Sequence, residues 1–161
     1  MLFSSIAPDF LTFPFLLKEC TRRFDGLVGS SIHGQAIKFG LYDDFFVRNS
    51  MISLCMACGF IARAKKLLDE MFSRDVISWN TIIGHLRSGD LGEALDLFRR
   101  MKRMNSSSDD DVVKPDKITI ASELSACAYL GAIDHGNWVH GYMKRSGIDC
   151  DVVIETELVD M

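Results

Sequence analysis

The sequence lacks several features that would place it in common protein classes. It holds only three prolines in 161 residues, so few positions interrupt a helix. No apolar run approaches the roughly 20 residues that an α-helix needs to cross a bilayer, which predicts a protein without a membrane segment. The five cysteines are an odd number and give no sign of a disulfide framework.

The chain also lacks an excess of positive charge. Its net charge is −4 and its isoelectric point is about 5.5, whereas a protein dominated by phosphate binding is usually basic. This balance counts against simple electrostatic binding of nucleic acid. It leaves open recognition through base edges, because local charge can differ from the total.

Signatures of metal and enzyme chemistry are missing as well. Cys55 and Cys58 form a single C-x-x-C pair, and structural zinc needs four ligands. None of the four histidines is followed two residues later by glutamate, so the H-x-E signature of zinc deaminases is absent. We therefore expect no metal, no cofactor and no enzyme activity, and we interpret Cys55 as a small packing residue.

What the sequence does contain is an internal repeat. An aspartate closes each successive segment, and three further residue types recur at matching places. Asn49 and Asn80 are both fifth in their segments, and His33 and His140 are both twenty-fourth. Cys20, Cys55 and Cys127 are all eleventh. The predicted segments are 1–9 (the tail of a preceding repeat), 10–44, 45–75, 76–116, 117–151 and 152–161 (the start of a further repeat).

Each segment has the pattern of two helices. Apolar residues recur at helical spacing in 60–72, 76–88 and 91–103, and glycines such as Gly59 separate the two helices. The polar stretch 104–113 predicts a loop inserted into its segment. Paired helices of this length bury their apolar faces only by stacking on neighbours. The fold expected is therefore all-α: an α-solenoid of stacked antiparallel helical hairpins, and a piece of a longer protein.

These motifs resemble a known family. "DVISWNTIIG", "GDLGEALDLFRRM", "VKPD" and "LSACAYLGAIDHG" are similar to the pentatricopeptide repeats of plants. The unequal segments resemble the subclass with alternating long, short and standard repeats. Segments 10–44 and 117–151 resemble the long type and 45–75 the short type. Segment 76–116 resembles a standard repeat that carries an insertion.

The resemblance implies binding of single-stranded RNA, about one base for each repeat. It implies work in organellar RNA processing or C-to-U editing, in a mitochondrion or chloroplast and with RNA-editing or processing factors, although no transit peptide is visible in this sequence. Pro14 and Ala121, which cannot bond a base edge, imply that the long repeats act as spacers. The residues implied to read bases are Asn49, Asp75, Asn80, Asp116 and Thr156, and those implied to sandwich a base are Phe46, Ile77 and Val153.

Plainer interpretations stand beside these. The asparagines could bond nearby backbone, and the aspartates could be helix N-caps, a role compatible with base discrimination. The histidines are expected to pack, and the basic run 99–103 is expected to be a solvated helix face. For the whole chain, the alternatives are a protein-interaction scaffold and a truncated product without independent activity.

Overall fold

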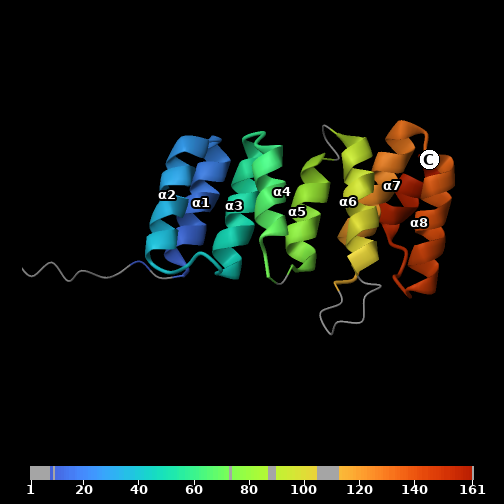
Figure 1. Cartoon of the computed structure of the whole chain (residues 1–161). Helices are drawn as coiled ribbons and strands as arrows, with labels where there is room; N and C mark the ends of the chain where they lie inside the picture. Colours follow the sequence, from blue (N-terminus) through green and yellow to red (C-terminus); the bar gives the residue numbers. More distant parts are fainter. Residues whose placement is uncertain (1–7, 9, 73, 87–89, 105–112, 161) are drawn as a thin grey trace, which may run out of the picture. The chain divides into compact units, whose positions relative to one another are not determined.

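The computed structural model describes residues 8, 10–72, 74–86, 90–104 and 113–160, and these form nine α-helices and no strand. The chain divides into two compact units, Met1–Phe72 and Ser73–Met161. The described helices alternate between first and second members of hairpins (Figure 1). The predicted all-α fold of the α-solenoid class is confirmed.

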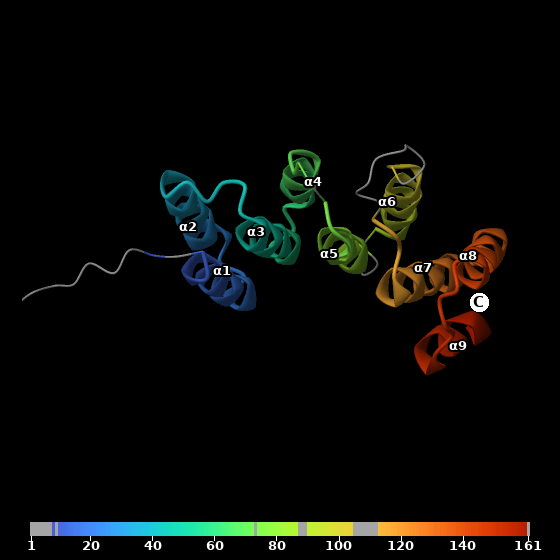
Figure 2. The same cartoon turned by 90° about the horizontal axis from the view of Figure 1, so that it is seen from below.

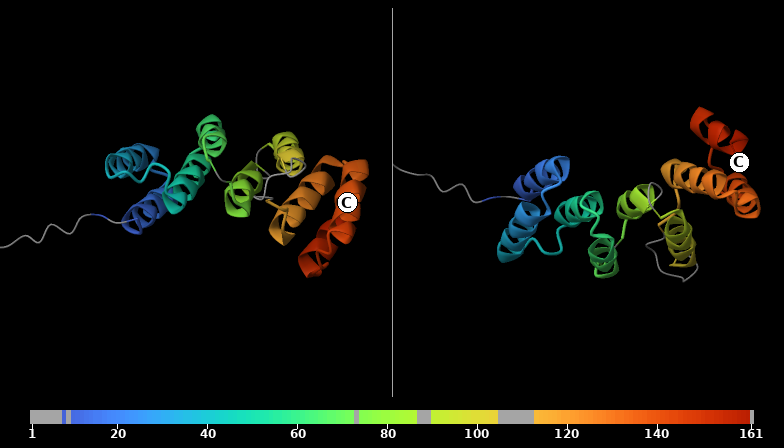
Figure 3. Two further views of the ribbon diagram at one scale, coloured as in Figure 1. Left: turned by 60° about the horizontal axis from the view of Figure 1, so that its bottom comes forward. Right: turned by 90° about the horizontal axis from the view of Figure 1, so that it is seen from above.

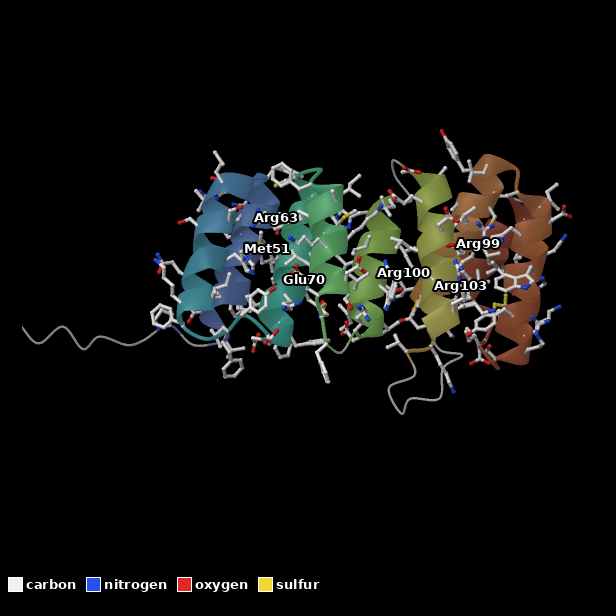
Figure 4. All side chains as sticks on the ribbon, in the orientation of Figure 1. Met51, Arg63, Glu70, Arg99, Arg100 and Arg103 are labelled. Atoms are coloured by element: carbon white, nitrogen blue, oxygen red, sulfur yellow. The ribbon has the colours of Figure 1, made fainter. Side chains whose placement is uncertain are left out.

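The first unit contains two helical hairpins. Its helices are α1 (Thr12–Arg23), α2 (Gly26–Lys38), α3 (Phe45–Ala57) and α4 (Ile61–Asp69). The first helices α1 and α3 pack side by side, α2 packs on both of them, and α4 packs on α3. The buried side chains between these helices include Leu17, Ala36, Met51, Ile52 and Leu68, and Met51 is labelled in Figure 4.

The second unit contains two hairpins and one further helix. Its helices are α5 (Val76–Leu86), α6 (Leu91–Met104), α7 (Lys117–Leu130), α8 (Ile133–Arg145) and α9 (Val152–Val159). Helices α5, α7 and α9 pack in succession, whereas α6 packs on α5 and α7, and α8 packs on α7. Figures 2 and 3 show this division into a layer of first helices and a layer of second helices.

The apolar faces expected from the sequence form the cores of both units. In α6, the side chains of Ala94, Leu95, Phe98 and Met101 are buried, as the helical spacing predicts. The helix expected over 60–72 is shorter, because α4 ends at Asp69. Met71 beyond it is nevertheless buried, so burial there does not require helical backbone.

The glycine turns explain how the hairpins reverse. Gly59, between α3 and α4, has a φ of +77°, and Gly131, between α7 and α8, has a φ of +65°. Such left-handed backbone costs other residues energy because their Cβ crowds the carbonyl. The glycine expected to separate α5 from α6, Gly89, and most of the predicted loop 104–113 lie outside the described residues.

Among the helices that the structure describes, none combines the length and apolar character that a bilayer crossing requires.

Candidate nucleic-acid interface

The aspartates that close the predicted segments cap the helices that follow. Asp44, Asp75, Asp116 and Asp151 directly precede α3, α5, α7 and α9. In each case the carboxylate accepts the backbone N–H three residues later, at 2.7–3.1 Å. The N-cap interpretation is therefore confirmed, and each capped turn holds its aspartate at the start of a first helix.

One predicted base-reading pair is joined directly. Asn80 on α5 donates from Nδ2 to Oδ1 of Asp116 at 2.9 Å. The hydroxyl of Thr119, in the first turn of α7, donates to Oδ1 of Asn80 at 2.6 Å. The packing of α5 against α7 thus brings residues 36 and 39 positions apart into one hydrogen-bonded cluster.

The charge of Asp116 fixes which way the Asn80 amide faces. Burial alone raises the pKa of Asp116, but hydrogen bonds from the backbone of Thr119, from the Asn80 side chain and from the backbone of Ile118 outweigh it and lower that pKa. The carboxyl is therefore ionised at neutral pH, and an ionised carboxylate can only accept. The amide must turn its NH₂ toward Asp116 and its oxygen toward the Thr119 hydroxyl.

This arrangement leaves part of the amide available. One N–H of Nδ2 and one lone pair of Oδ1 are not used by Asp116 and Thr119. The Asn80 side chain is half-buried, so the cluster reaches the surface. A donor and an acceptor side by side can form two hydrogen bonds to the edge of a planar ligand.

Apolar side chains flank the cluster along the first helices. Ile77 lies three residues before Asn80 on α5, so the two share a helix face. Its side chain is 58% exposed, and that of Ile118 on α7 is 63% exposed. Large apolar side chains in this position offer flat contact surface beside the free amide edge. The other predicted sandwiching residues, Phe46 on α3 and Val153 on α9, are exposed as well.

The second predicted pair is divided between the two units. Asn49 is half-buried on α3 in the first unit, whereas Asp75 caps α5 in the second. Their pairing stays a prediction. Thr156 on α9 is exposed, and its hydroxyl donates to the carbonyl of Val152 at 2.8 Å, so only its lone pairs remain for a ligand.

The long segments carry no base-reading group at their fifth positions. Pro14 lies in the first turn of α1, where a missing N–H is tolerated. Ala121 lies on α7. Neither side chain can donate or accept a hydrogen bond, and their role as spacers stays a prediction.

The basic run on α6 is solvated only in part: Arg99 and Arg103 are exposed as expected, whereas Arg100 and Lys102 are half-buried. Arg99, Arg100 and Arg103 all lie on this helix (Figure 4). The Nζ atom of Lys102, however, lies 3.8 Å from the ring centroid of Trp138 and 4.2 Å from that of Tyr142, both on α8. Burial, and then the charge of Arg145, lower the pKa of Lys102. This lysine joins α6 to α8 through cation–π contact, which spacing along α6 could not predict.

The cysteines and histidines considered as metal ligands lie in packed surroundings. Cys20, Cys55 and Cys127 are buried, and burial raises the pKa of each thiol. His33 is buried, whereas His140 is partly exposed. Among the described residues, no three His, Cys, Asp or Glu side chains come together in a way that could hold a metal ion.

Two residues of the site were missed by reasoning from the sequence. Ile118 is second in its segment, as Ile77 is, and the repeat pattern was sufficient to find it. Thr119 is harder to find, because its hydroxyl acts on a residue of another helix. The available signal was the Asp116-x-x-Thr119 spacing of a capping box, which predicts the cap but not the contact with Asn80.

Comparison with known proteins finds the same kind of repeat and the same fold. The family profile described as PPR repeat matches residues 46–76 and 77–106, one residue later in start than the segments 45–75 and 76–116. The chain is 38% identical over 159 residues to pentatricopeptide repeat-containing protein At1g59720, chloroplastic/mitochondrial, of Arabidopsis thaliana. That match covers 96% of this chain and 24% of the relative.

A second Arabidopsis thaliana relative, pentatricopeptide repeat-containing protein At3g22690, is 38% identical over 162 residues, covering 100% of this chain and 18% of the relative. The chain thus spans about a quarter or less of these two proteins. Among solved structures, maize PPR10 in complex with an 18-nucleotide psaJ RNA element aligns with a TM-score of 0.76 at 21% identity, covering 97% of this chain and 23% of PPR10. The chain therefore contains pentatricopeptide repeats, at residues 46–76 and 77–106.

Proposed function

We propose that this chain binds single-stranded RNA by reading bases repeat by repeat, as part of a longer protein that acts in organellar RNA processing or C-to-U editing. The observation that carries the proposal is the Asn80–Asp116–Thr119 cluster, whose free amide edge lies beside the exposed Ile77. The RNA-bound PPR10 structure and the organellar names of relatives support the same proposal.

The cluster can contact both the edge and the faces of a base. The free N–H and lone pair of Asn80 match a donor and an acceptor on a Watson–Crick edge. Ile77 and Ile118 cover the faces, as apolar contacts do in repeat proteins that read one base per repeat. The family resemblance assigns uridine to asparagine paired with aspartate, so we expect uridine at this position and at the Asn49 position.

Fluorescence anisotropy with short RNAs tests the proposal. The probe carries adjacent uridines, and the reference RNA has the same composition in scrambled order. Each of Asn49→Ala and Asn80→Ala is expected to weaken binding of the uridine RNA by about fivefold, since a hydrogen bond contributes about 1 kcal/mol net. Equal affinity for both RNAs, or no loss in the double variant, would contradict the proposal.

A protein-interaction scaffold is the second candidate, and the net charge of −4 favours it. The two candidates differ in their dependence on salt. Contacts to phosphate weaken as the salt concentration rises because bound counterions are released, whereas an apolar interface is nearly insensitive. The affinity for RNA measured between 50 and 200 mM salt therefore distinguishes the two candidates, because the effect of counterion release is large over that range.

A further inference from the structure

The third residue of the first helices α3, α5, α7 and α9 is buried at an equivalent place, yet its chemistry varies. In the four helices that follow a capping aspartate, this side chain is fully buried. Two of the four carry a hydroxyl and two are purely apolar. The residues are Val47 on α3, Ser78 on α5, Thr119 on α7 and Ile154 on α9.

Whether this third residue carries a hydroxyl or is apolar follows from the fifth residue of the preceding segment. Where that residue is asparagine, the next segment has a hydroxyl: Asn49 precedes Ser78, and Asn80 precedes Thr119. Where it cannot hydrogen-bond, the next segment is apolar. Pro14 precedes Val47, and Ala121 precedes Ile154. Thr12, the third residue of segment 10–44, has no counterpart because the sequence lacks the fifth residue of the segment before it.

The structure supplies the physical reason in the second unit. The Thr119 hydroxyl lies 2.6 Å from Oδ1 of Asn80 and 2.9 Å from Oδ1 of Asp116, and it has one hydrogen to donate. Asp116 Oδ1 already accepts from Asn80 Nδ2 and from the Thr119 backbone N–H. The shorter contact, to Asn80, is therefore the better use of that hydrogen. A buried hydroxyl without a partner is costly. The Ser78 hydroxyl finds its partner within its own cap, where it donates to the carbonyl of Asp75 at 2.8 Å, so the contact that carries the argument is the one that Thr119 makes.

We propose that Thr119 is a positioning residue for base recognition, holding the Asn80 amide in the one orientation that distinguishes uracil from cytosine. This inference rests on the proposed function. Asp116 holds the NH₂ end of the amide and Thr119 holds the oxygen end. With both ends held, the free donor and acceptor are presented in a fixed order.

The order matters because the two pyrimidines differ by exchange of donors and acceptors. Uracil presents an acceptor, a donor and an acceptor along its Watson–Crick edge, whereas cytosine presents an acceptor, an acceptor and a donor. An amide that is free to rotate can present either its donor or its acceptor at the same place, and it can therefore bind either base. An amide whose two ends are fixed forms its hydrogen bonds with uracil only. Against cytosine, donor faces donor and acceptor faces acceptor, and such unpaired polar groups reduce binding.

The chain itself shows that the carboxylate half of the cap forms without the hydroxyl. Asp44 caps α3 by accepting the backbone N–H of Val47 at 3.0 Å, close to the 2.9 Å between Asp116 and the Thr119 N–H. Thr119→Val therefore keeps this carboxylate cap with a side chain of nearly the same shape, and it removes the hydroxyl that accepts from the backbone N–H of Asp116 at 3.1 Å. The matched conservative variant is Thr119→Ser, which retains the hydroxyl.

A double-mutant cycle without RNA tests the contact first. Urea unfolding is followed by circular dichroism for the wild type, Asn80→Ala, Thr119→Val and the double variant. Thr119→Val is expected to raise the unfolding equilibrium constant about fivefold or more when Asn80 is present. In the Asn80→Ala background the rise is expected to be clearly smaller, because there the substitution removes only the contacts between the Thr119 hydroxyl and Asp116. The double variant reproduces the natural pairing of Ala121 with Ile154. Equal effects in both backgrounds would overturn the proposal, because the hydroxyl would then serve only the cap.

Base preference tests the consequence. Affinity for RNA with uridine at the read position is compared with affinity for the same RNA with cytidine. The uridine preference is expected to fall about fivefold in Thr119→Val and to be retained in Thr119→Ser. An unchanged preference in a folded Thr119→Val variant refutes positioning, whereas no preference in the wild type refutes the proposed function while leaving the unfolding cycle interpretable.

Failure of Thr119→Val to fold is also decisive. If the single variant is unfolded and the double variant folds, the hydroxyl is required only in the presence of the amide, which supports the proposal. If both are unfolded, the hydroxyl is required by the helix itself, and the proposal is wrong.

Discussion

The buried carboxyl of Glu123 makes the stability of the second unit depend on pH. Glu123 lies on α7 with no exposed surface, and neither of its oxygens has a hydrogen-bond partner within the described structure. Burial raises its pKa from 4.5 to about 8, with the charge of Asp96 adding to the rise and that of Arg99 opposing it. Nε2 of His135 lies 3.7 Å from Oε1, and burial, together with Arg99 and Lys102, lowers the pKa of that imidazole.

The direction of the effect follows from proton binding. Between pH 4.5 and about 8, the folded state holds the Glu123 proton and the unfolded chain releases it. The unfolding free energy therefore falls as pH rises, by about 1.4 kcal/mol for each pH unit in that window. The full loss is on the order of 5 kcal/mol, a large part of the stability of an ordinary domain. Below pH 4.5 the contribution of Glu123 is fully present.

Glu123→Gln is the perturbation, because glutamine has nearly the same shape and does not titrate. Urea unfolding at pH 5, 6, 7 and 8 is compared between the wild type and the variant. Taking the difference removes the contributions of groups that both chains share, including His33. The variant is expected to gain stability relative to the wild type steadily with pH.

Two results would refute this reasoning. A difference that stays constant from pH 5 to 8 would mean that Glu123 titrates at an ordinary pKa. A difference that stays flat between pH 5 and 6 and changes only above about pH 6.5, where imidazole loses its proton, would mean that the carboxylate is ionised in the folded protein and paired with a charged His135. Either outcome would place water or charge beside Glu123 that the packing excludes.

Three further substitutions probe packing and backbone. Phe98→Ala is expected to cost about 3–5 kcal/mol in urea unfolding because Phe98 is fully buried, whereas Phe72→Ala, at a fully exposed position, should cost almost nothing. Gly131→Ala is expected to destabilise by about 1 kcal/mol, since its φ is +65° with open space around it, while Gly34→Ala inside α2 should stabilise by about 0.5–1 kcal/mol. Lys102→Gln is expected to lower stability by about 1 kcal/mol through lost cation–π contact and to change the fluorescence of the adjacent tryptophan.

Features that depend on neighbours in sequence were predictable. The apolar stripe of α6 follows from side chains three and four residues apart, which share a helix face in any fold. The capping aspartates follow from the same short range, because Asp116 and the Thr119 N–H are three residues apart. The fold class also followed, since short amphipathic hairpins have few ways to bury their faces.

Features that join separate helices were not predictable to the same degree. The repeat pattern paired Asn80 with Asp116, but it could not show that Thr119 holds the other end of the amide. It could not show that Lys102 lies against Trp138, or that Glu123 is sealed from water. Each depends on which helix packs opposite and at what distance, and a repeat spacing contains no such information.

The sequence by itself determined the helices, their buried faces, their capping residues and the family, because those depend on local geometry and periodicity. Tertiary structure alone decided which polar groups meet in the second unit. Hydrogen bonds and pKa values depend on atoms brought within a few ångströms by helix packing, and Asn80 and Thr119 come that close only when α5 lies against α7.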